Sequence, residues 1–140
     1  MKKRRLEIDY SYDFELLGVI SSAKSFKLAW DINTKFGIRL IKQPDLKIQF
    51  NNNITGTYTY FSHDSPLNLV RLFRNRANEM EAAKNLLVQE HPHFDYIIMS
   101  QGADALPINV LQEQLRSISS IELVAFIPLD SLKSKDYFIF

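Results

Sequence analysis

The chain contains no cysteine among its 140 residues. Disulfides, zinc–thiolate sites, iron–sulfur clusters and thiol catalysis are therefore excluded. Glycine is scarce as well, since there are four and none lies near another. Phosphate-binding loops need clustered glycines so that the backbone can approach the phosphate, and no such loop is expected. A GxSxG nucleophile elbow is also absent, so nucleophilic catalysis finds no support.

Long hydrophobic runs and an excess of charge are missing too. No apolar run approaches the ~20 residues that a membrane-spanning helix needs. The basic residues 2–5 are followed at once by Glu7, Asp9 and Asp13, whereas a signal peptide would continue with an apolar segment. With a formal net charge of +1, bulk electrostatics favour neither a membrane nor a nucleic acid as a partner. We expect a soluble, cytoplasmic protein.

What is present is the composition of a globular domain, with 46% apolar and 24% charged residues. A domain of this length buries about 68% of the surface of its unfolded chain, so it needs no disulfide or metal to fold. Alternation of apolar and polar residues predicts strands, and a period of about 3.6 predicts helices. The expected helices span 23–36 and 107–118, with a short third helix at 77–87, and the expected strands span 6–20, 46–50, 57–61, 67–73, 94–99 and 121–128.

This order of elements predicts one α+β domain over residues 1–140. We expect a mostly antiparallel sheet with the two main helices packed on one face. Residues 46–50 and 57–61 should form a hairpin. The order is also compatible with a split βαβ, ferredoxin-like layout that carries one insertion.

Three features qualify this pattern. The polar side of the first strand, which includes Asp13 and Glu15, is expected to face solvent. Asn33 projects into the apolar sector of its helix, where its amide needs a hydrogen-bond partner, and a neighbouring backbone group is the expected one. The apolar tail at residues 137–140 should be docked, either on the core of its own chain or on a partner subunit.

Residues 88–96 resemble the signature of the IPExxxVDY family of bacterial proteins. That signature is Ile-Pro-Glu, three residues, then Val-Asp-Tyr, and the chain reads Val-Gln-Glu, His-Pro-His, then Phe-Asp-Tyr. Glu90, Asp95 and Tyr96 match it, while Gln89 replaces the proline. The segments 6–20, 28–30 and 132–135 are similar as well, so the resemblance extends over nearly the whole chain. It implies a single α+β domain in a cytoplasmic bacterial protein, and it implies no activity.

The first hypothesis for this segment is structural. Glu90 would accept backbone N–H groups where a loop meets the sheet, Asp95 would fix the entry of the strand, and Tyr96 would pack its ring and pair its hydroxyl. The same Glu90, Asp95 and Tyr96 are the candidate binding residues if the segment forms the wall of a pocket for a ligand or partner.

Two other chemistries remain open. His91, His93 and Asp95 would point the same way in an extended segment, as in a metal-dependent hydrolase, with His63 and Asp64 as further candidates. Alternatively, single-stranded RNA would stack on an aromatic sheet surface flanked by arginines. The residues of that surface would be Tyr58, Tyr60, Phe61, Arg71, Arg74 and Arg76.

Taken together, the sequence predicts a non-enzymatic binding or protein-interaction domain without a cofactor. We expect it to self-associate as a homodimer through an apolar edge or its tail. The identity of any other protein or small-molecule partner does not follow from the sequence.

Overall fold

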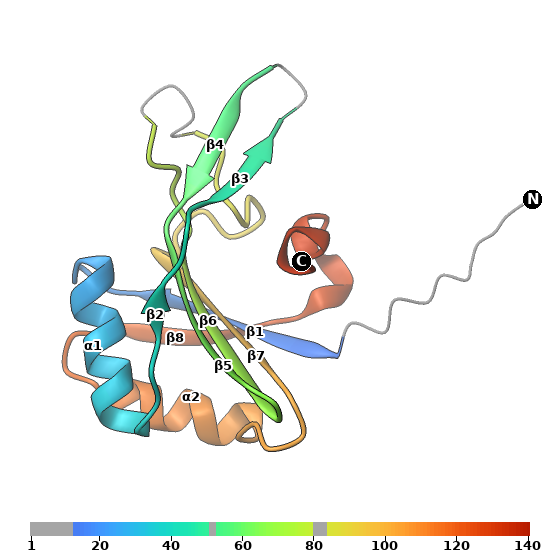
Figure 1. Cartoon of the computed structure of the whole chain (residues 1–140). Coiled ribbons are helices and arrows are strands. Elements are labelled where there is room, and N and C mark those ends of the chain that lie inside the picture. Colours follow the sequence, from blue (N-terminus) through green and yellow to red (C-terminus); the bar gives the residue numbers. More distant parts are fainter. Residues whose placement is uncertain (1–12, 51–52, 80–83) are drawn as a thin grey trace, which may run out of the picture.

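The computed structural model describes residues 13–50, 53–79 and 84–140 (Figure 1). Within these ranges it contains two α-helices, eight strands and two short 3-10 helices near the C-terminal end. In chain order these are β1 (Phe14–Ile20), α1 (Ser25–Phe36), β2 (Ile41–Lys42), β3 (Leu46–Gln49), β4 (Thr55–Tyr58), β5 (Tyr60–Ser65), β6 (Asn68–Arg74), β7 (Tyr96–Gln101), α2 (Ile108–Arg116), β8 (Leu123–Ile127), η3 (Leu129–Ser131) and η4 (Ser134–Phe138).

The main sheet has six strands in the order β2-β5-β6-β7-β1-β8. Every neighbouring pair in it is antiparallel. Because β7 and β8 both run antiparallel to β1, which lies between them, β7–α2–β8 is a split βαβ unit. A separate hairpin, β3–β4, extends away from the two helices (Figure 1). The predicted α+β class and the hairpin are both confirmed.

The sheet has a separate apolar core on each face. Alternate residues of one strand point to opposite faces, so Leu17 and Val19 contact the helices while Leu16 points the other way. The helix side of the sheet is covered by α1 and α2, as predicted. The opposite side is covered by residues 87–94, the β3–β4 hairpin and the C-terminal 3-10 helices.

The polar side of the first strand faces solvent where the structure describes it, and the strand becomes buried on both faces toward its end. Asp13 and Glu15 are exposed, as predicted, but β1 is buried on both sides from Leu16 to Val19. The remainder of the predicted first strand, residues 6–12, lies outside the described residues. Three helical turns of α1 are ended by Gly37, which takes the left-handed conformation at φ 66° and donates its N–H to Asn33 O at 2.8 Å.

The predicted short helix at 77–87 falls partly outside the described residues, which omit 80–83. Residues 77–79 and 84–87 are turns, bends and irregular chain instead of helix. The predicted strand at 57–61 is interrupted at Thr59, where the chain passes from β4 into β5. None of the described helices has the length and apolarity to cross a membrane.

Asn33 is satisfied as predicted. Its Nδ2 donates to Leu40 O at 3.3 Å, and its Oδ1 accepts the Leu40 N–H at 2.7 Å. The side chain therefore fixes the chain that leaves α1 toward β2.

The apolar tail docks on its own core. Phe138 is buried, with its ring 5.1 Å from that of Phe73 and 6.3 Å from that of Phe14. The outermost residues, Ile139 and Phe140, remain exposed. Because Phe138 is already used within the chain, the tail no longer argues for a dimer.

Candidate functional site

Asp95 and Tyr96 both hold the turn that leads into α1. Asp95 Oδ2 accepts the N–H of Ser21 at 2.9 Å, and the Tyr96 hydroxyl donates to Ala23 O. Burial raises the pKa of the Tyr96 hydroxyl, which keeps it protonated as a donor. These contacts match the structural roles expected of the two residues, and they determine where residues 21–25 lie relative to β7.

Glu90 lies apart from them. Its carboxylate accepts the Lys133 N–H at 2.7 Å and the Ser134 hydroxyl at 3.3 Å, both at the start of η4. Partial burial opposes ionisation, but these hydrogen bonds outweigh it and lower the pKa of Glu90. The structure thus separates the three matched residues into two places, with Asp95 and Tyr96 by the turn into α1 and Glu90 by the C-terminal segment.

The two histidines of the segment pack on an aromatic ring. The His93 ring centroid lies 4.3 Å from that of Phe94, and the His91 centroid lies 5.5 Å from it. Phe94 in turn packs against Gly18, where an added Cβ would lie 2.2 Å from the Phe94 ring. His63, the third histidine, accepts the Arg39 N–H through Nδ1 at 3.1 Å.

The expected convergence of His91, His93 and Asp95 is therefore not found. Asp95 is turned toward Ser21, whereas the imidazoles lie over Phe94. Within residues 13–50, 53–79 and 84–140, no three histidine or carboxylate side chains group as metal ligands would. The described residues therefore do not place His91, His93 and Asp95 as the ligands that a metal-dependent hydrolase would need.

The predicted RNA-stacking surface does not form either. Tyr58 is fully buried with its hydroxyl bonded to Asn85 O, and burial raises its pKa to about 12. Phe61 is buried on the helix side of the sheet, and Tyr60 packs on the opposite side against Phe73, with ring centroids 5.1 Å apart. The three rings therefore share no exposed face on which bases could stack.

Sequence reasoning missed Asn75, which organises the loop that carries the signature. This side chain is fully buried, and its Oδ1 accepts the Val88 N–H at 2.7 Å. Its Nδ2 donates to the carbonyls of His91 and Phe94, at 3.3 and 2.9 Å. No sequence pattern signals this role, because the partners lie 13 to 19 positions away in an irregular loop.

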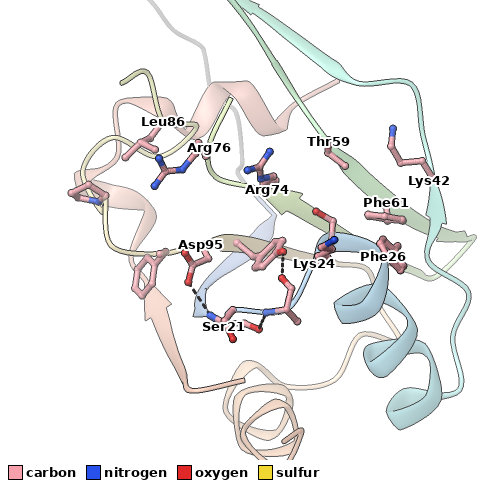
Figure 2. Close-up of a pocket in the computed structure, with 16 residues that line it drawn as sticks. Ser21, Lys24, Phe26, Lys42, Thr59, Phe61, Arg74, Arg76, Leu86 and Asp95 are labelled. Carbon is pink, nitrogen blue, oxygen red and sulfur yellow. Dashed lines mark hydrogen bonds between the residues drawn. The ribbon is translucent and has the colours of Figure 1, made fainter. Parts of the chain in front are cut away.

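A cleft of about 710 Å³ opens beside the turn held by Asp95 and Tyr96 (Figure 2). One side of it is formed by residues 21–26 at the start of α1, and the other by Arg74, Arg76 and Leu86. Asp95 and Tyr96 are both in its wall, but Glu90, His91 and His93 are not. The remaining lining residues are Lys42, Thr59, Phe61, Pro92 and Phe94.

The charge of this cleft is strongly positive. Four basic side chains line it, from Lys24, Lys42, Arg74 and Arg76, against the single carboxylate of Asp95. The four come from the turn before α1, from β2, and from the end of β6 with the loop that follows. Because the whole chain has a net charge of only +1, this clustering is local and is invisible in the bulk composition.

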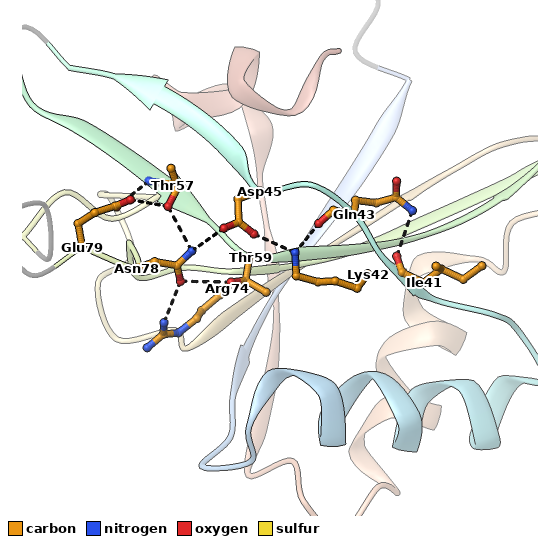
Figure 3. Close-up of polar contacts among 9 residues, drawn as sticks. All are labelled: Ile41, Lys42, Gln43, Asp45, Thr57, Thr59, Arg74, Asn78 and Glu79. Atoms are coloured by element: carbon orange, nitrogen blue, oxygen red, sulfur yellow. Dashed lines mark hydrogen bonds and ion pairs between the residues drawn. The ribbon is translucent and has the colours of Figure 1, made fainter.

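A polar network positions two of these cations (Figure 3). Asn78 is its centre, since Oδ1 accepts from Arg74 Nη1 and Thr59 Oγ1, each at 3.2 Å. Its Nδ2 donates to Asp45 Oδ2 at 3.2 Å, and the other oxygen of Asp45 forms an ion pair with Lys42 at 2.9 Å. Arg74 and Lys42 are therefore linked through shared partners and kept at the mouth of the cleft.

Glu79 anchors this network to the β3–β4 hairpin. Its carboxylate accepts the Thr57 hydroxyl at 2.5 Å and the Thr57 N–H at 2.8 Å, and these two hydrogen bonds lower the pKa of Glu79. Thr57 Oγ1 in turn accepts from Asn78 Nδ2 at 3.3 Å. The charge of Glu79 is thus used in holding the hairpin, outside the lining of the cleft.

Comparison with known proteins leaves the site to be interpreted from its own residues. No family model, no curated protein and no solved structure matches this chain. The resemblance to the IPExxxVDY family stays a prediction.

Chemically, the cleft is suited to an oxyanion. Guanidinium groups bind carboxylate and phosphate through paired N–H donors, which is why arginine is common in such sites. The side chains of Lys24 and Arg76 have no hydrogen-bond or ion-pair partner among the described residues, so their charges are available to a ligand. The hydroxyl of Ser21 is already used, since it donates to Ser120 O at 2.6 Å.

Proposed function

We propose that the protein is a non-enzymatic binding domain whose ligand is an organic anion held in this cleft. The observation that carries the proposal is the gathering of Lys24, Lys42, Arg74 and Arg76 around a cavity with one carboxylate. That carboxylate, Asp95, accepts the Ser21 N–H, and Lys42 is ion-paired with Asp45, so positive charge remains in excess around the cleft. Asp95 and Tyr96 act as positioning residues, because they hold the turn that carries Lys24.

The ligand that fits this cleft has an apolar part as well as an acidic group. Phe26 is 68% exposed, an unusual state for a phenyl ring, and it lies beside buried Phe61 in the lining. Leu86 and Pro92 add apolar surface on the other side. A volume of about 710 Å³ lies within the range of small-molecule sites. A phosphate or carboxylate attached to an aromatic or aliphatic body satisfies both halves of this surface.

Isothermal titration of the full chain at low ionic strength tests this proposal. The probes are phenyl phosphate and benzoate, which differ in their acidic group, and phenol as their uncharged counterpart. We expect at least one anion to bind better than phenol, and to bind less well as salt is added. Phenyl phosphate and benzoate together tell a phosphate preference from a carboxylate preference.

Charge reversal locates the site. Arg76→Glu should lower the affinity for the anion by at least about tenfold, because a hydrogen bond to a charged group contributes about 1.5–3 kcal/mol. Lys47→Glu is the matched control, since Lys47 is exposed on β3 and outside the cleft. Equal losses in the two variants, or no binding of either anion to the unmodified chain, would refute the proposal.

We further propose that the protein self-associates through β8. This strand is an edge of the main sheet and exposes Leu123 (44%) and Phe126 (46%). Exposed apolar edge strands offer backbone groups for pairing with another strand. Two copies of β8 placed antiparallel about Ala125 would form one continuous sheet with a two-fold axis. Gln112, which donates to Val124 O at 3.1 Å, is the contact that would have to yield. Light scattering measures the resulting mass.

A further inference from the structure

A second hollow lies on the helix side of the sheet, at the other end of α1 from the cleft. Its volume is about 380 Å³. It is lined by the last two turns of α1, by β6 and β7, and by α2 with the loop that precedes it. We call it the interhelical pocket. We call the cleft lined by Lys24, Lys42, Arg74 and Arg76 the anion cleft. None of its lining residues is among those of the interhelical pocket, so the two sites are independent.

The interhelical pocket is apolar over most of its wall. Aliphatic and aromatic side chains from both helices and from two strands face it, and several are among the most buried in the molecule. The apolar lining residues from the helices and strands are Ile32, Phe36, Val70, Ile98, Leu111 and Leu115, of which all but Phe36 are buried. A wall of this kind binds the hydrocarbon part of a ligand, because the contact removes apolar surface from water on both sides.

One polar side chain is buried in this wall. Ser100 is 6% exposed and lies on β7 two residues beyond Ile98, so it points to the helix side of the sheet. The other buried serines, Ser21, Ser62 and Ser134, each donate a side-chain hydrogen bond to a carbonyl or carboxylate. Ser100 is different, because its hydroxyl has no hydrogen-bond partner within the described parts of the chain.

A buried hydroxyl without a partner is unfavourable, and native proteins rarely keep one without a use. In the interhelical pocket the unpaired hydroxyl of Ser100 faces a hollow large enough for a small molecule. A serine hydroxyl both donates and accepts, so it is suited to a hydroxyl or carbonyl group on a ligand.

The charge at the mouth of this pocket points to a neutral ligand. Lys35 and Asp104 are both exposed there and have opposite signs. Asn68 and Gln114 contribute amides, which carry no charge. Neither an anion nor a cation is favoured by this balance, in contrast to the anion cleft.

We propose that the interhelical pocket binds a compact, neutral, mainly apolar molecule that carries one hydroxyl or carbonyl group, and that this group bonds to Ser100 Oγ. The hydrocarbon body lies between α1 and α2 against Val70 and Ile98. The pocket thus gives the protein a second ligand class, separate from the organic anion.

The test uses 4-ethylphenol and ethylbenzene, which share a hydrocarbon body and differ by one hydroxyl. Methyl resonances of Val70, Ile98, Leu111 and Leu115 report binding by NMR titration of the full chain. We expect saturable shifts at these methyls with both probes, and 4-ethylphenol binding about two- to tenfold more tightly, as one net hydrogen bond would give. Ser100→Ala should bind ethylbenzene unchanged and lose the preference for the phenol.

Ser119→Ala, an exposed serine outside the pocket, is the control and should keep the preference. Leu106→Trp, at the exposed mouth, should weaken both probes, and it disturbs no buried position. The proposal is overturned if neither probe shifts the pocket methyls to saturation. It is likewise overturned if Ser100→Ala keeps the full preference for 4-ethylphenol.

Discussion

Asn75 shows how much of this fold depends on a single side chain. Its amide makes three hydrogen bonds to the loop of residues 88–94, and its own backbone N–H and carbonyl bond to Asp95 O and the Leu87 N–H. The loop that carries the signature is irregular, so these bonds replace those that a helix or strand would have supplied. Asn75 therefore supports the wall of the anion cleft without touching it.

We predict that Asn75→Ala lowers the free energy of unfolding by about 2–4 kcal/mol, because it leaves a buried N–H, a buried carbonyl and a partly buried carbonyl without this partner. Urea denaturation followed by circular dichroism measures the change. Asn109→Ala, at an exposed position on α2, is the control and should stay within about 0.5 kcal/mol of the unmodified protein. A loss for Asn75→Ala no larger than that of the control would show that the loop is stable without the hydrogen bonds of Asn75.

At the same scale, Gly18 and Phe94 explain a limit of reading the sequence. Gly18 lies in the middle of β1, where glycine is normally unfavourable, and it is there because the Phe94 ring occupies the space of a side chain. The requirement arises from a residue 76 positions away in the chain, so no local pattern announces it. Asn33 was predictable because its own helix defined an apolar side.

Among the elements, the C-terminal 3-10 helix η4 is held by a carboxylate from the loop of residues 88–94. Glu90 accepts the Lys133 N–H and the Ser134 hydroxyl, and its pKa is lowered in the folded protein. A carboxyl whose folded pKa lies below its unfolded value adds stability above the unfolded pKa. That stability is lost as the pH falls through the folded pKa.

We predict that Glu90→Gln destabilises the protein by about 0.5–1 kcal/mol at pH 7, since the group is largely exposed and its interactions are screened. As the pH falls through the lowered pKa of Glu90, the carboxylate of the unmodified protein becomes a neutral carboxyl, so the difference from the neutral Gln side chain should shrink. Denaturant unfolding at pH 7 and at a series of lower pH values measures it. Glu122→Gln is the control, because Glu122 is exposed and makes no side-chain hydrogen bond among those described. A difference that persists unchanged at low pH would exclude this ionisation as its cause.

Elements with a regular pattern were the ones the sequence could predict. α1 and α2 bury one side each at helical spacing, and β6, β7 and β8 are apolar runs between turns, so burial alone places them within a few residues. The cover of the second sheet face is different. It consists of loops and 3-10 helices whose side chains follow no period, and their packing is settled only when the sheet is already in place.

On the scale of the whole molecule, the anion cleft could not be foreseen for a related reason. Its cations come from three separate parts of the chain, and their partner Asn78 belongs to a segment for which a helix was predicted. The sequence did identify Asp95 and Tyr96, which lie in its wall, but it grouped them with Glu90, which the fold directs elsewhere.

Self-association is also decided at this scale. We predict that the unmodified chain forms a dimer and that Phe126→Lys yields a monomer, because a charged side chain on an edge strand opposes pairing with a second copy. Light scattering over a range of concentrations measures the mass, and circular dichroism confirms that the variant is folded. Phe26→Lys removes an even more exposed ring, on α1 and away from β8, and should leave the dimer intact. A monomeric unmodified chain, or a dimer that survives Phe126→Lys, would contradict pairing through β8.

The position of β1 between β7 and β8 has a consequence for biosynthesis. Ser21 and Asp95 are 74 positions apart, and β8 follows later still. While the ribosome is producing residues 21–95, β1 has been translated but neither neighbouring strand exists, so its aliphatic side chains remain open to chaperones and to other nascent chains. The centre of the sheet can close only once β7 is present to pair with both β1 and β6, and such non-local pairing favours slow folding.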